Sequence, residues 1–190
     1  SAYATKHRIT VVRYDPVAGA VLAGTEDGLV YILDQECFPA GIVSTGLNDA
    51  VLDIRPYTRR KELHLLALGR SRLTDSTASG PGWSVPLDGG EPVGVTVMDG
   101  SAYVAVWNGD APCMGMDTGS SVLLTYDTLT GERTGTDSLF AGRAFGPAVN
   151  LDGTSLMFIS WSGEIRAKDI SGVPGIRACP LGKKLIRQAE

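Results

Sequence analysis

Short runs of apolar residues, each bounded by glycine, aspartate or proline, follow one another along most of the chain. Four of these runs share one form, a strand-like segment that ends in aspartate, at residues 28–34, 82–88, 121–127 and 163–169. From Asp34 through Asp88 and Asp127 to Asp169 the steps are 54, 39 and 42 residues. Apolar runs of this length between turn-forming residues are typical of β-strands. The pattern therefore predicts an all-β protein built from a repeated unit.

Two further strand-like runs precede each of these segments. The nearer runs lie at residues 20–24, 63–68, 102–107 and 155–160, and the farther ones at residues 8–12, 50–54, 92–97 and 146–150. At least three strands recur within each stretch of about 40 residues, which is the length of one β-propeller blade. We predict about four blades, at residues 8–48, 49–91, 92–139 and 140–181, and a polar tail at residues 182–190.

The connections between the last two strands of each predicted unit differ in length. The first and fourth are short and contain Asp27-Gly28 and Ser162-Gly163, dipeptides that favour tight hairpin turns. The second and third are expected to carry long insertions at residues 69–82 and 108–120. Because loops of that length in a compact fold are often functional, we expect them to form the partner-binding surfaces.

A β-sandwich with the same number of strands is the alternative fold, since it also has turns about every 8–12 residues. A sandwich gives no reason to repeat one unit four times, so the recurring aspartate favours the propeller. Closed propellers carry roughly 4–8 blades. Four blades form either a small closed ring or an arc of a larger propeller. We expect the arc, whose open edges invite a partner strand.

Composition narrows the kind of partner that the chain can bind. The chain has 190 residues, of which 43% are hydrophobic, and a formal net charge of −4 with dispersed basic residues. A basic stripe for nucleic acid is therefore missing, and no apolar run reaches the roughly 18 residues of a membrane-spanning helix. The first residues lack the apolar core of a signal peptide. Ser1 is not an initiating methionine, however, so a leader could have been removed.

The three cysteines, Cys37, Cys113 and Cys179, lie far apart and form no Cys-x-x-Cys pair. No histidine lies at metal-ligand spacing from them, so a zinc site is not expected. Because three is odd, at most one internal disulfide can form, and at least one thiol stays free or pairs with another chain. The alternative role for such cysteines is that of small buried hydrophobic residues.

The most specific motifs lie between residues 82 and 132. Gly82-Trp83 opens a strand that leads to a Gly-Glu turn at residues 90–91. A Pro-Cys pair follows at residues 112–113, and Asp127-Thr128-Leu129-Thr130-Gly131 ends the next strand. This succession resembles the C-terminal propeller of the PilC/PilY family of type IV pilus tip proteins, in which the same motifs follow in the same order. Turns of the form Asp-x-x-Thr-Gly also mark quinoprotein-like propellers.

The resemblance implies an exported, extracellular or cell-surface protein that supports pilus assembly and adhesion. Its implied partners are pilins, or another chain or segment that completes the propeller. It also implies an oxidising compartment, in which Cys113 is the candidate for a disulfide. Members of the family often bind calcium through an acidic loop with ligands at alternate positions. No Asp-x-Asp-x-Asn-Gly run occurs in this chain, so we assign no metal ligand and expect no cofactor.

The sequence offers little support for a catalytic centre. His64 lies between two leucines in a strand and His7 between two basic residues, where a hydrogen-bonded or solvated histidine is commoner than a catalytic one. Carboxylates for glycoside hydrolysis would come from Asp75, Asp110 and Asp117 in the expected loops, where aspartates more often form turns. The adjacent cysteines of quinone dehydrogenases are missing. We therefore predict a non-catalytic module.

Trp161, in a Ser-Trp-Ser-Gly turn, is the candidate aromatic anchor for a partner or a sugar. The alternative is that all three tryptophans of the chain pack between blades. Asp110, Met114 and Met116 in the third unit are the other candidate interaction residues. Two function classes remain open: an exported adhesion or assembly module of the pilus, and a generic propeller scaffold or an arc of a quinoprotein-like enzyme whose active residues lie on missing blades.

Overall fold

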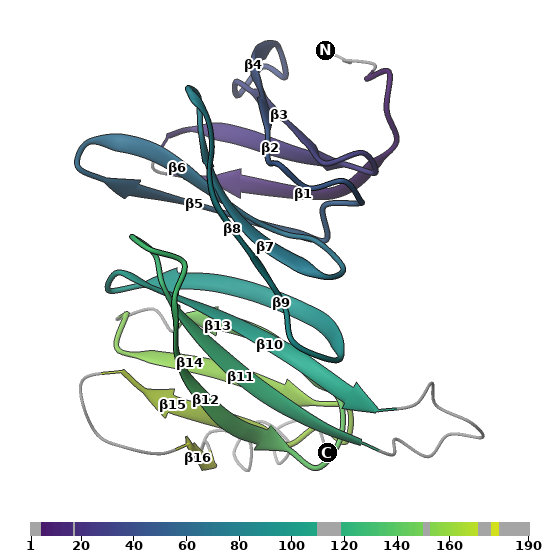
Figure 1. Ribbon diagram of the computed structural model, residues 1–190, viewed down its shortest axis with the longest axis vertical. Coiled ribbons are helices and arrows are strands. Elements are labelled where there is room, and N and C mark those ends of the chain that lie inside the picture. The colour runs from purple at the N-terminus through teal and green to yellow at the C-terminus, as the bar shows by residue number, and fades with distance from the viewer. Residues whose placement is uncertain (1–4, 17, 110–118, 150–152, 171–175, 179–190) are drawn as a thin grey trace, which may run out of the picture. The chain divides into compact units, whose positions relative to one another are not determined.

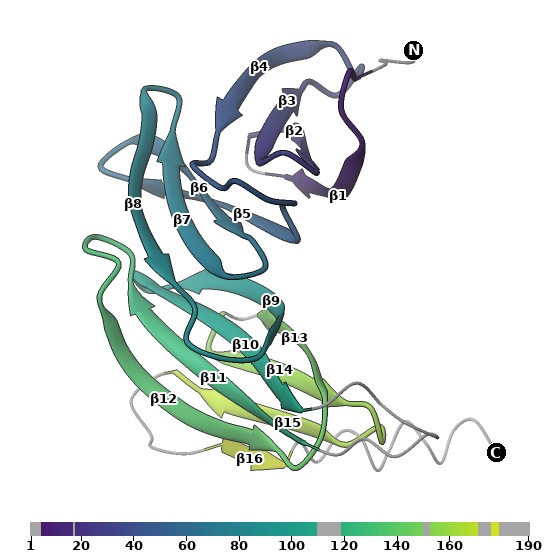
Figure 2. The ribbon, with the colours of Figure 1, turned by 45° about the vertical axis from the view of Figure 1, so that its right-hand side comes forward.

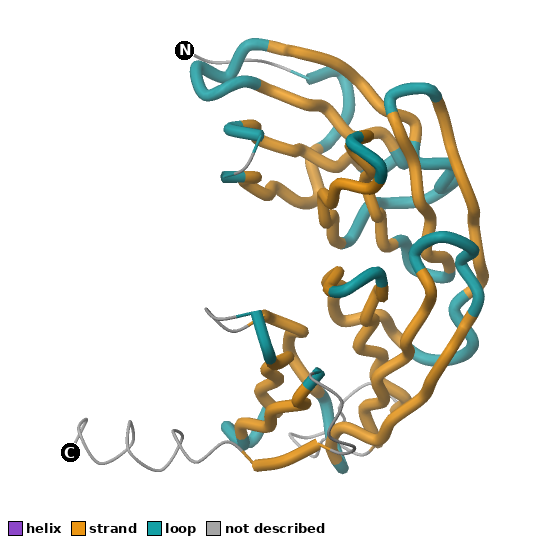
Figure 3. Tube along the Cα trace, turned by 90° about the vertical axis from the view of Figure 1, so that its left-hand side faces the viewer, coloured by secondary structure: helices purple, strands orange, loops and turns teal. Residues whose placement is uncertain are grey.

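The computed structural model describes residues 5–16, 18–109, 119–149, 153–170 and 176–178. These residues form sixteen β-strands in four sheets of four strands each. Within every sheet the strands follow one another in chain order, so each sheet is a meander (Figure 1). Strands and loops make up this described part of the chain (Figure 3).

Two sheets lie in the first half of the chain. The first contains β1 (Ile9–Asp15), β2 (Ala20–Thr25), β3 (Leu29–Leu33) and β4 (Pro39–Ser44). The second contains β5 (Asp53–Arg59), β6 (Glu62–Leu68), β7 (Arg72–Thr77) and β8 (Gly80–Pro86). In β6, residues 64–68 are buried without a break, as in a strand that is covered on both faces.

The other two sheets lie in the second half. The third contains β9 (Glu91–Met98), β10 (Ser101–Gly109), β11 (Gly119–Asp127) and β12 (Arg133–Phe140). The fourth contains β13 (Ala144–Val149), β14 (Ser155–Ser160), β15 (Ile165–Asp169) and β16 (Ile176–Ala178). In each sheet, strands consecutive in the chain are hydrogen-bonded neighbours, and the strands are five to nine residues long except β16, which has three.

The chain divides into two compact units, one of Ser1–Asp88 with Tyr126–Arg133 and the other of Gly89–Thr125 with Thr134–Glu190. The core of the first unit lies between its two sheets and comprises Leu22, Val30, Val43, Leu47, Val51, Ile54, Leu65 and Ala67. Truncation of a fully buried member such as Leu65 to alanine would cost about 2–5 kcal/mol of folding free energy. The unit is therefore held together by packing of one sheet face on another.

The core of the second unit is built in the same way. The third and fourth sheets lie face to face (Figure 2). Their shared core comprises Tyr103, Ala105, Leu123, Leu139, Phe140, Ala144, Leu156 and Phe158. The prediction of an all-β chain with about four blade-like units is confirmed. The β-sandwich alternative is wrong, because the strands form four separate meanders and not two sheets with crossed connections.

The predicted insertion at residues 69–82 is not a loop. It contains β7 and the first residues of β8, joined by a tight turn. The sequence pattern missed β7 because its central residues, Thr74, Asp75 and Ser76, are polar but fully buried. Their side chains find partners inside the fold; for example, Ser76 Oγ donates to the Thr45 carbonyl oxygen at 3.1 Å. Polar residues whose hydrogen bonds are formed inside the protein can be buried, so a strand made of them is not detected as an apolar run.

The long step of 54 residues from Asp34 to Asp88 is also explained by the missed strand β7. Asp34 follows the third strand of its sheet and Asp127 ends the third strand of another, whereas Asp88 follows the fourth strand, β8. The step of 54 residues therefore includes one more strand, and no insertion is needed to explain it. The second expected loop falls largely on residues 110–118, and the predicted tail on residues 182–190; both lie outside the described residues.

Candidate interaction surface

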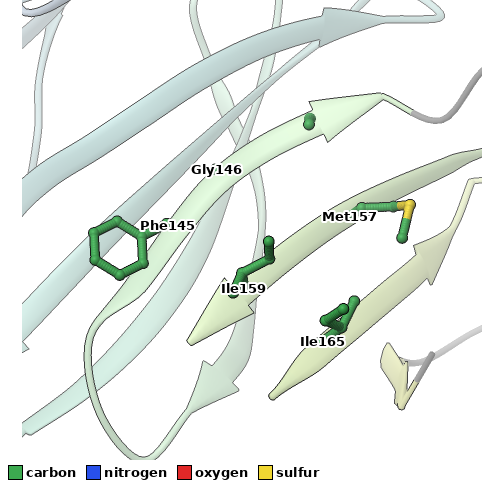
Figure 4. A pocket seen from close by; sticks show the side chains of 6 residues that line it. Phe145, Gly146, Met157, Ile159 and Ile165 are labelled. Atoms are coloured by element: carbon green, nitrogen blue, oxygen red, sulfur yellow. The ribbon is translucent and has the colours of Figure 1, made fainter. Parts of the chain in front are cut away.

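The open face of the fourth sheet is apolar. Its lining residues surround a hollow of about 290 Å³ and come from β13, β14 and β15: Phe145, Gly146, Ala148, Met157, Ile159 and Ile165. Figure 4 shows the labelled side chains on these three adjacent strands. None of these six residues has a polar or charged side chain, so the side chains of this surface, which we call the fourth-sheet face, offer apolar contacts.

Strand alternation explains why these residues share one face. Phe145 pairs with Ile159, which pairs with Ile165 on the next strand. Their neighbours Leu156 and Phe158 point to the opposite face and are fully buried in the core. Because successive side chains in a strand alternate between the two faces, burial of one set leaves the other set on the open face.

A bulge in β13 shapes the hollow. The register with β14 shifts between Phe145 and Ala148, and Gly146 between them has a φ of 101°, in the region that favours glycine. A Cβ at Gly146 would lie 3.1 Å from the Met157 carbonyl oxygen. The bulge therefore requires a residue without a side chain here, and this leaves the space between the flanking apolar groups.

Trp161 extends the fourth-sheet face. Its ring stacks on Phe145, with 5.8 Å between the ring centroids, and 69% of the residue is exposed. The turn that carries it is fixed, since its backbone N–H donates to the Arg143 carbonyl oxygen at 2.9 Å and Ser160 Oγ accepts from the Glu164 N–H at 2.9 Å. The alternative in which all three tryptophans are packed between blades is therefore wrong for Trp161.

The other two tryptophans are packed inside the fold. Trp107 is buried, and the Arg143 guanidinium lies over its ring at 5.0 Å from the centroid. Trp83 is half-buried, and its Nε1 donates to the Thr128 carbonyl oxygen at 2.9 Å. The Arg59 guanidinium donates to that same oxygen at 2.7 Å, so the carbonyl is held from two sides.

The hydrogen bond from Trp83 to the Thr128 carbonyl oxygen joins the two ends of residues 82–132, the segment that resembles the PilC/PilY propeller. The turn at residues 127–131 is closed by Asp127, whose Oδ1 accepts from the N–H groups of Leu129 and Thr130, both at 2.8 Å. These bonds, the one from Thr130 first, hold the pKa of the Asp127 carboxyl below its usual range. Gly131, in the same turn, lies against the indole of Trp83. The Gly-Trp strand and the Asp-x-x-Thr-Gly turn are thus one packed structure.

A buried polar cluster lies in the second sheet. His64 Nδ1 is 2.9 Å from Asp75 Oδ2 and 3.1 Å from Asp75 Oδ1. The Tyr57 hydroxyl donates to Oδ1 at 2.8 Å, and the Tyr57 and His64 rings stack at 5.1 Å. Burial, together with this hydrogen bond to the Asp75 carboxylate, raises the pKa of Tyr57. Both oxygens of Asp75 are engaged by side chains of the sheet itself, so the cluster stabilises the fold.

This pairing was missed in the sequence because Asp75 was assigned to a loop. In the structure His64 pairs with Thr77 and Leu66 pairs with Asp75 across β6 and β7, which places the histidine and the aspartate diagonally on one face. If residues 72–77 had been recognised as a strand, the sequence would have predicted that Asp75 lies near His64 on the neighbouring strand. His7 lies elsewhere, half-exposed, with its Nδ1 2.8 Å from Asp27 Oδ2.

The remaining candidate residues are only partly covered by the structure. Asp110, Cys113, Met114, Met116 and Asp117 lie outside the described residues, as does Cys179. Cys37 has a free thiol and is partly buried. In the ranges that the structure describes, no group of three or more histidine, cysteine or acidic residues is placed to hold a metal ion. The same ranges contain no helix long and apolar enough to span a membrane.

The four meanders define the class of protein: the chain has a β-propeller fold. A chain in the crystal structure of BBS1N in complex with ARL6DN is similar with a TM-score of 0.67 and 16% identity, over 95% of this chain and 57% of that one. The Cps50 (Swd1) β-propeller domain of Myceliophteria thermophila is similar with a TM-score of 0.56 and 13% identity, over 90% and 68%.

A chain of the mitotic checkpoint complex is also similar, with a TM-score of 0.61 and 14% identity, over 85% of this chain and 49% of that one. No protein-family model and no curated protein matches the chain. The chain thus spans little more than half of the first of these solved structures. At such low identities the likeness concerns the fold.

Proposed function

We propose that this chain is a protein-binding propeller module and that its partner contacts the fourth-sheet face together with Trp161. The observation that carries the proposal is the group of large apolar side chains exposed there: Phe145 is 42% exposed, Ile159 48% and Trp161 69%. Exposed apolar patches of this kind mark sites of protein interaction. Two of the similar solved structures are described as complexes, which supports a role in protein assembly.

The hydrophobic effect gives the expected strength of this contact. A partner that covers the exposed part of Trp161 removes about 170 Å² from water, which corresponds to about 4 kcal/mol at 25 cal/mol/Å². Exposed tryptophans that become fully desolvated are typical interface hot spots. Loss of the ring should therefore weaken binding by about 2–4 kcal/mol, or roughly 30- to 1,000-fold in Kd.

We further propose that the module belongs to an exported type IV pilus-associated protein that acts in adhesion or pilus assembly, with pilins among its partners. Support comes from residues 82–132, whose succession of motifs resembles the C-terminal propeller of the PilC/PilY family. An extracellular or cell-surface location and a disulfide at Cys113 belong to the same proposal. The function does not require a catalytic residue or a cofactor.

Co-sedimentation with purified type IV pili tests both parts. We expect the wild-type chain to sediment with the pili and Trp161→Ala to lose most of that binding. Leu129→Ala is the matched control, since Leu129 is a 54% exposed apolar residue in a turn that is not part of the fourth sheet. Absence of wild-type binding would refute the pilus proposal. Equal binding by Trp161→Ala and the control would refute the proposed contact surface.

A further inference from the structure

A partner on the fourth-sheet face meets side chains, because the backbone of the inner strands is engaged within the sheet. β14 pairs with β13 on one side and with β15 on the other, and β15 also pairs with β16. The N–H and C=O groups of inner strands point along the sheet toward their neighbours. The groups that face the partner are therefore those of Phe145, Met157, Ile159 and Ile165 (Figure 4). Their side chains contain no oxygen or nitrogen.

A hydrogen-bond donor lies beside this apolar surface, the indole N–H of Trp161. The ring stacks on Phe145 and the residue is mostly exposed. Among the residues that the structure describes, none accepts a hydrogen bond from Trp161 Nε1, whereas Trp83 Nε1 donates to the Thr128 carbonyl oxygen. An exposed indole offers a partner a large apolar ring and a donor for one carbonyl oxygen. The face thus combines apolar contacts with a donor.

The area of the fourth-sheet face indicates the size of its occupant. β13 and β14 have six residues each and β15 has five. Three strands about 4.8 Å apart, with about six residues at roughly 3.3 Å each, present about 280 Å². Even with the exposed part of the Trp161 ring, about 170 Å², this area is well below the roughly 800 Å² per partner of a standard interface between folded proteins. The face has the size of a contact with a short peptide segment.

The hydrogen-bonding groups of the face indicate the backbone of that segment. An extended segment of ordinary residues would bring its N–H groups against side chains that have no oxygen acceptor, which costs free energy. A helix satisfies its own N–H groups, but it uses its carbonyl oxygens to do so and leaves none for Trp161 Nε1. Prolines have no N–H, and the polyproline II conformation leaves their carbonyl oxygens without internal hydrogen bonds. A proline-rich segment is therefore complementary to the face.

We infer that the fourth-sheet face and Trp161 bind a proline-rich segment of the partner in the polyproline II conformation. The inference rests on the proposed function, since it takes this face to be the partner contact and names the chemistry of the occupant. A proline ring of the segment occupies the hollow lined by Phe145 and Ile159, and Trp161 Nε1 donates to a carbonyl oxygen of the segment. Grooves lined by aromatic residues bind polyproline II segments in this way.

The length of the face sets the length of the segment. Six residues in the polyproline II conformation extend about 19 Å, and a six-residue strand such as β14 spans about 20 Å. A segment of about six residues therefore covers the face from end to end. Because proline-rich chains already populate this conformation when free, little entropy is lost on binding. We expect a Kd of roughly 10–500 µM for such a small contact.

Fluorescence anisotropy of a labelled decaproline peptide, titrated with the 190-residue chain, tests the inference. The wild-type chain should bind decaproline and should bind a Gly-Ser peptide of the same length at least roughly 10-fold more weakly. Trp161→Ala and Ile159→Lys should each abolish detectable binding, the latter because an unpaired charge would lie under the segment. Trp161→Phe keeps an aromatic ring without the N–H and should weaken binding about 5-fold, the effect of one hydrogen bond.

Leu129→Ala is again the control and should bind decaproline as the wild type does. Trp161 and Ile159 are exposed, so their variants should keep urea midpoints close to that of the wild type, which shows that they are folded.

The inference is overturned if the wild type does not bind decaproline at concentrations up to about 1 mM, if the Gly-Ser peptide binds equally well, or if Trp161→Ala binds unchanged. Pili that bind through Trp161 in the absence of decaproline binding would overturn this inference and leave the proposed function standing. Decaproline binding without pilus binding would support the inference and refute the pilus proposal.

Discussion

Gly131 offers the sharpest test of the packing around Trp83. Its φ is 74°, and a Cβ built on it would lie 2.7 Å from two atoms of the Trp83 indole. Substitution by alanine thus has two costs, the left-handed backbone and the collision with the ring. Gly46 separates them, because it lies in the same unit, has a φ of 75°, and a Cβ there would meet only Pro81 Cβ at 3.4 Å, an ordinary contact distance.

The two costs have different sizes. The left-handed conformation costs a non-glycine residue about 1–2 kcal/mol, and this cost applies equally to Gly46→Ala and Gly131→Ala. Overpacking adds about 1–3 kcal/mol and applies only to Gly131→Ala. Both substitutions also restrict the unfolded chain by similar amounts, which cancels in the comparison. We therefore expect Gly131→Ala to be less stable than Gly46→Ala by about 2 kcal/mol.

Urea unfolding followed by tryptophan fluorescence measures this difference. With a slope of about 2 kcal/mol/M, the midpoint of Gly131→Ala should lie about 1 M below that of Gly46→Ala. In a Trp83→Leu background the difference should shrink, because the smaller side chain leaves room for the new methyl group. Equal midpoints for the two glycine variants would refute the contact between the Asp127–Gly131 turn and Trp83.

The buried polar cluster gives two further predictions. Asp75→Ala removes the acceptor of both Tyr57 and His64, and two unsatisfied buried groups at about 1–3 kcal/mol each should lower the free energy of unfolding by about 2–5 kcal/mol. The control is Asp88→Ala, whose ion pair with Arg133 is exposed and which should change that free energy by less than about 0.5 kcal/mol. Similar losses for the two variants in urea unfolding would contradict the structural role of the cluster. The raised pKa of Tyr57 exceeds the unfolded value of about 10, so its stabilisation is complete below pH 10 and is lost as the pH rises above it. The urea midpoint of the wild type should therefore fall more steeply between pH 9 and pH 11 than that of Tyr57→Phe, and parallel slopes would show that Tyr57 titrates as it does in the unfolded chain.

The strand pattern was readable wherever apolar residues alternate with turn-forming ones. Residues 20–24 and 155–160 were predicted as strands and correspond to β2 and β14, because hydrophobic periodicity and Gly-containing turns are local signals. β7 was missed because its buried residues are polar and depend on partners elsewhere in the fold, such as Thr45 and Tyr57. A local pattern contains no information on such partners.

The candidate site was predicted only in part. Trp161 was singled out from its turn, and it lies on the exposed apolar surface beside Phe145. Phe145, Met157 and Ile159 were not singled out, because an apolar residue in a strand looks the same in sequence whether its face is covered or open. Register with the neighbouring strands and burial of the opposite face in the core decide which set remains exposed.

By itself the sequence determined that this is an all-β chain of about four repeated units, because turn residues and apolar runs act over a few neighbours. Only the tertiary structure decided three other features: the strand identity of β7, the contact of Trp83 with a turn more than 40 residues away, and the open apolar face of the fourth sheet. These features depend on which strands pair and which sheets stack. Strand pairing and sheet stacking both depend on contacts between residues far apart in the sequence, which the pattern of a single segment does not contain.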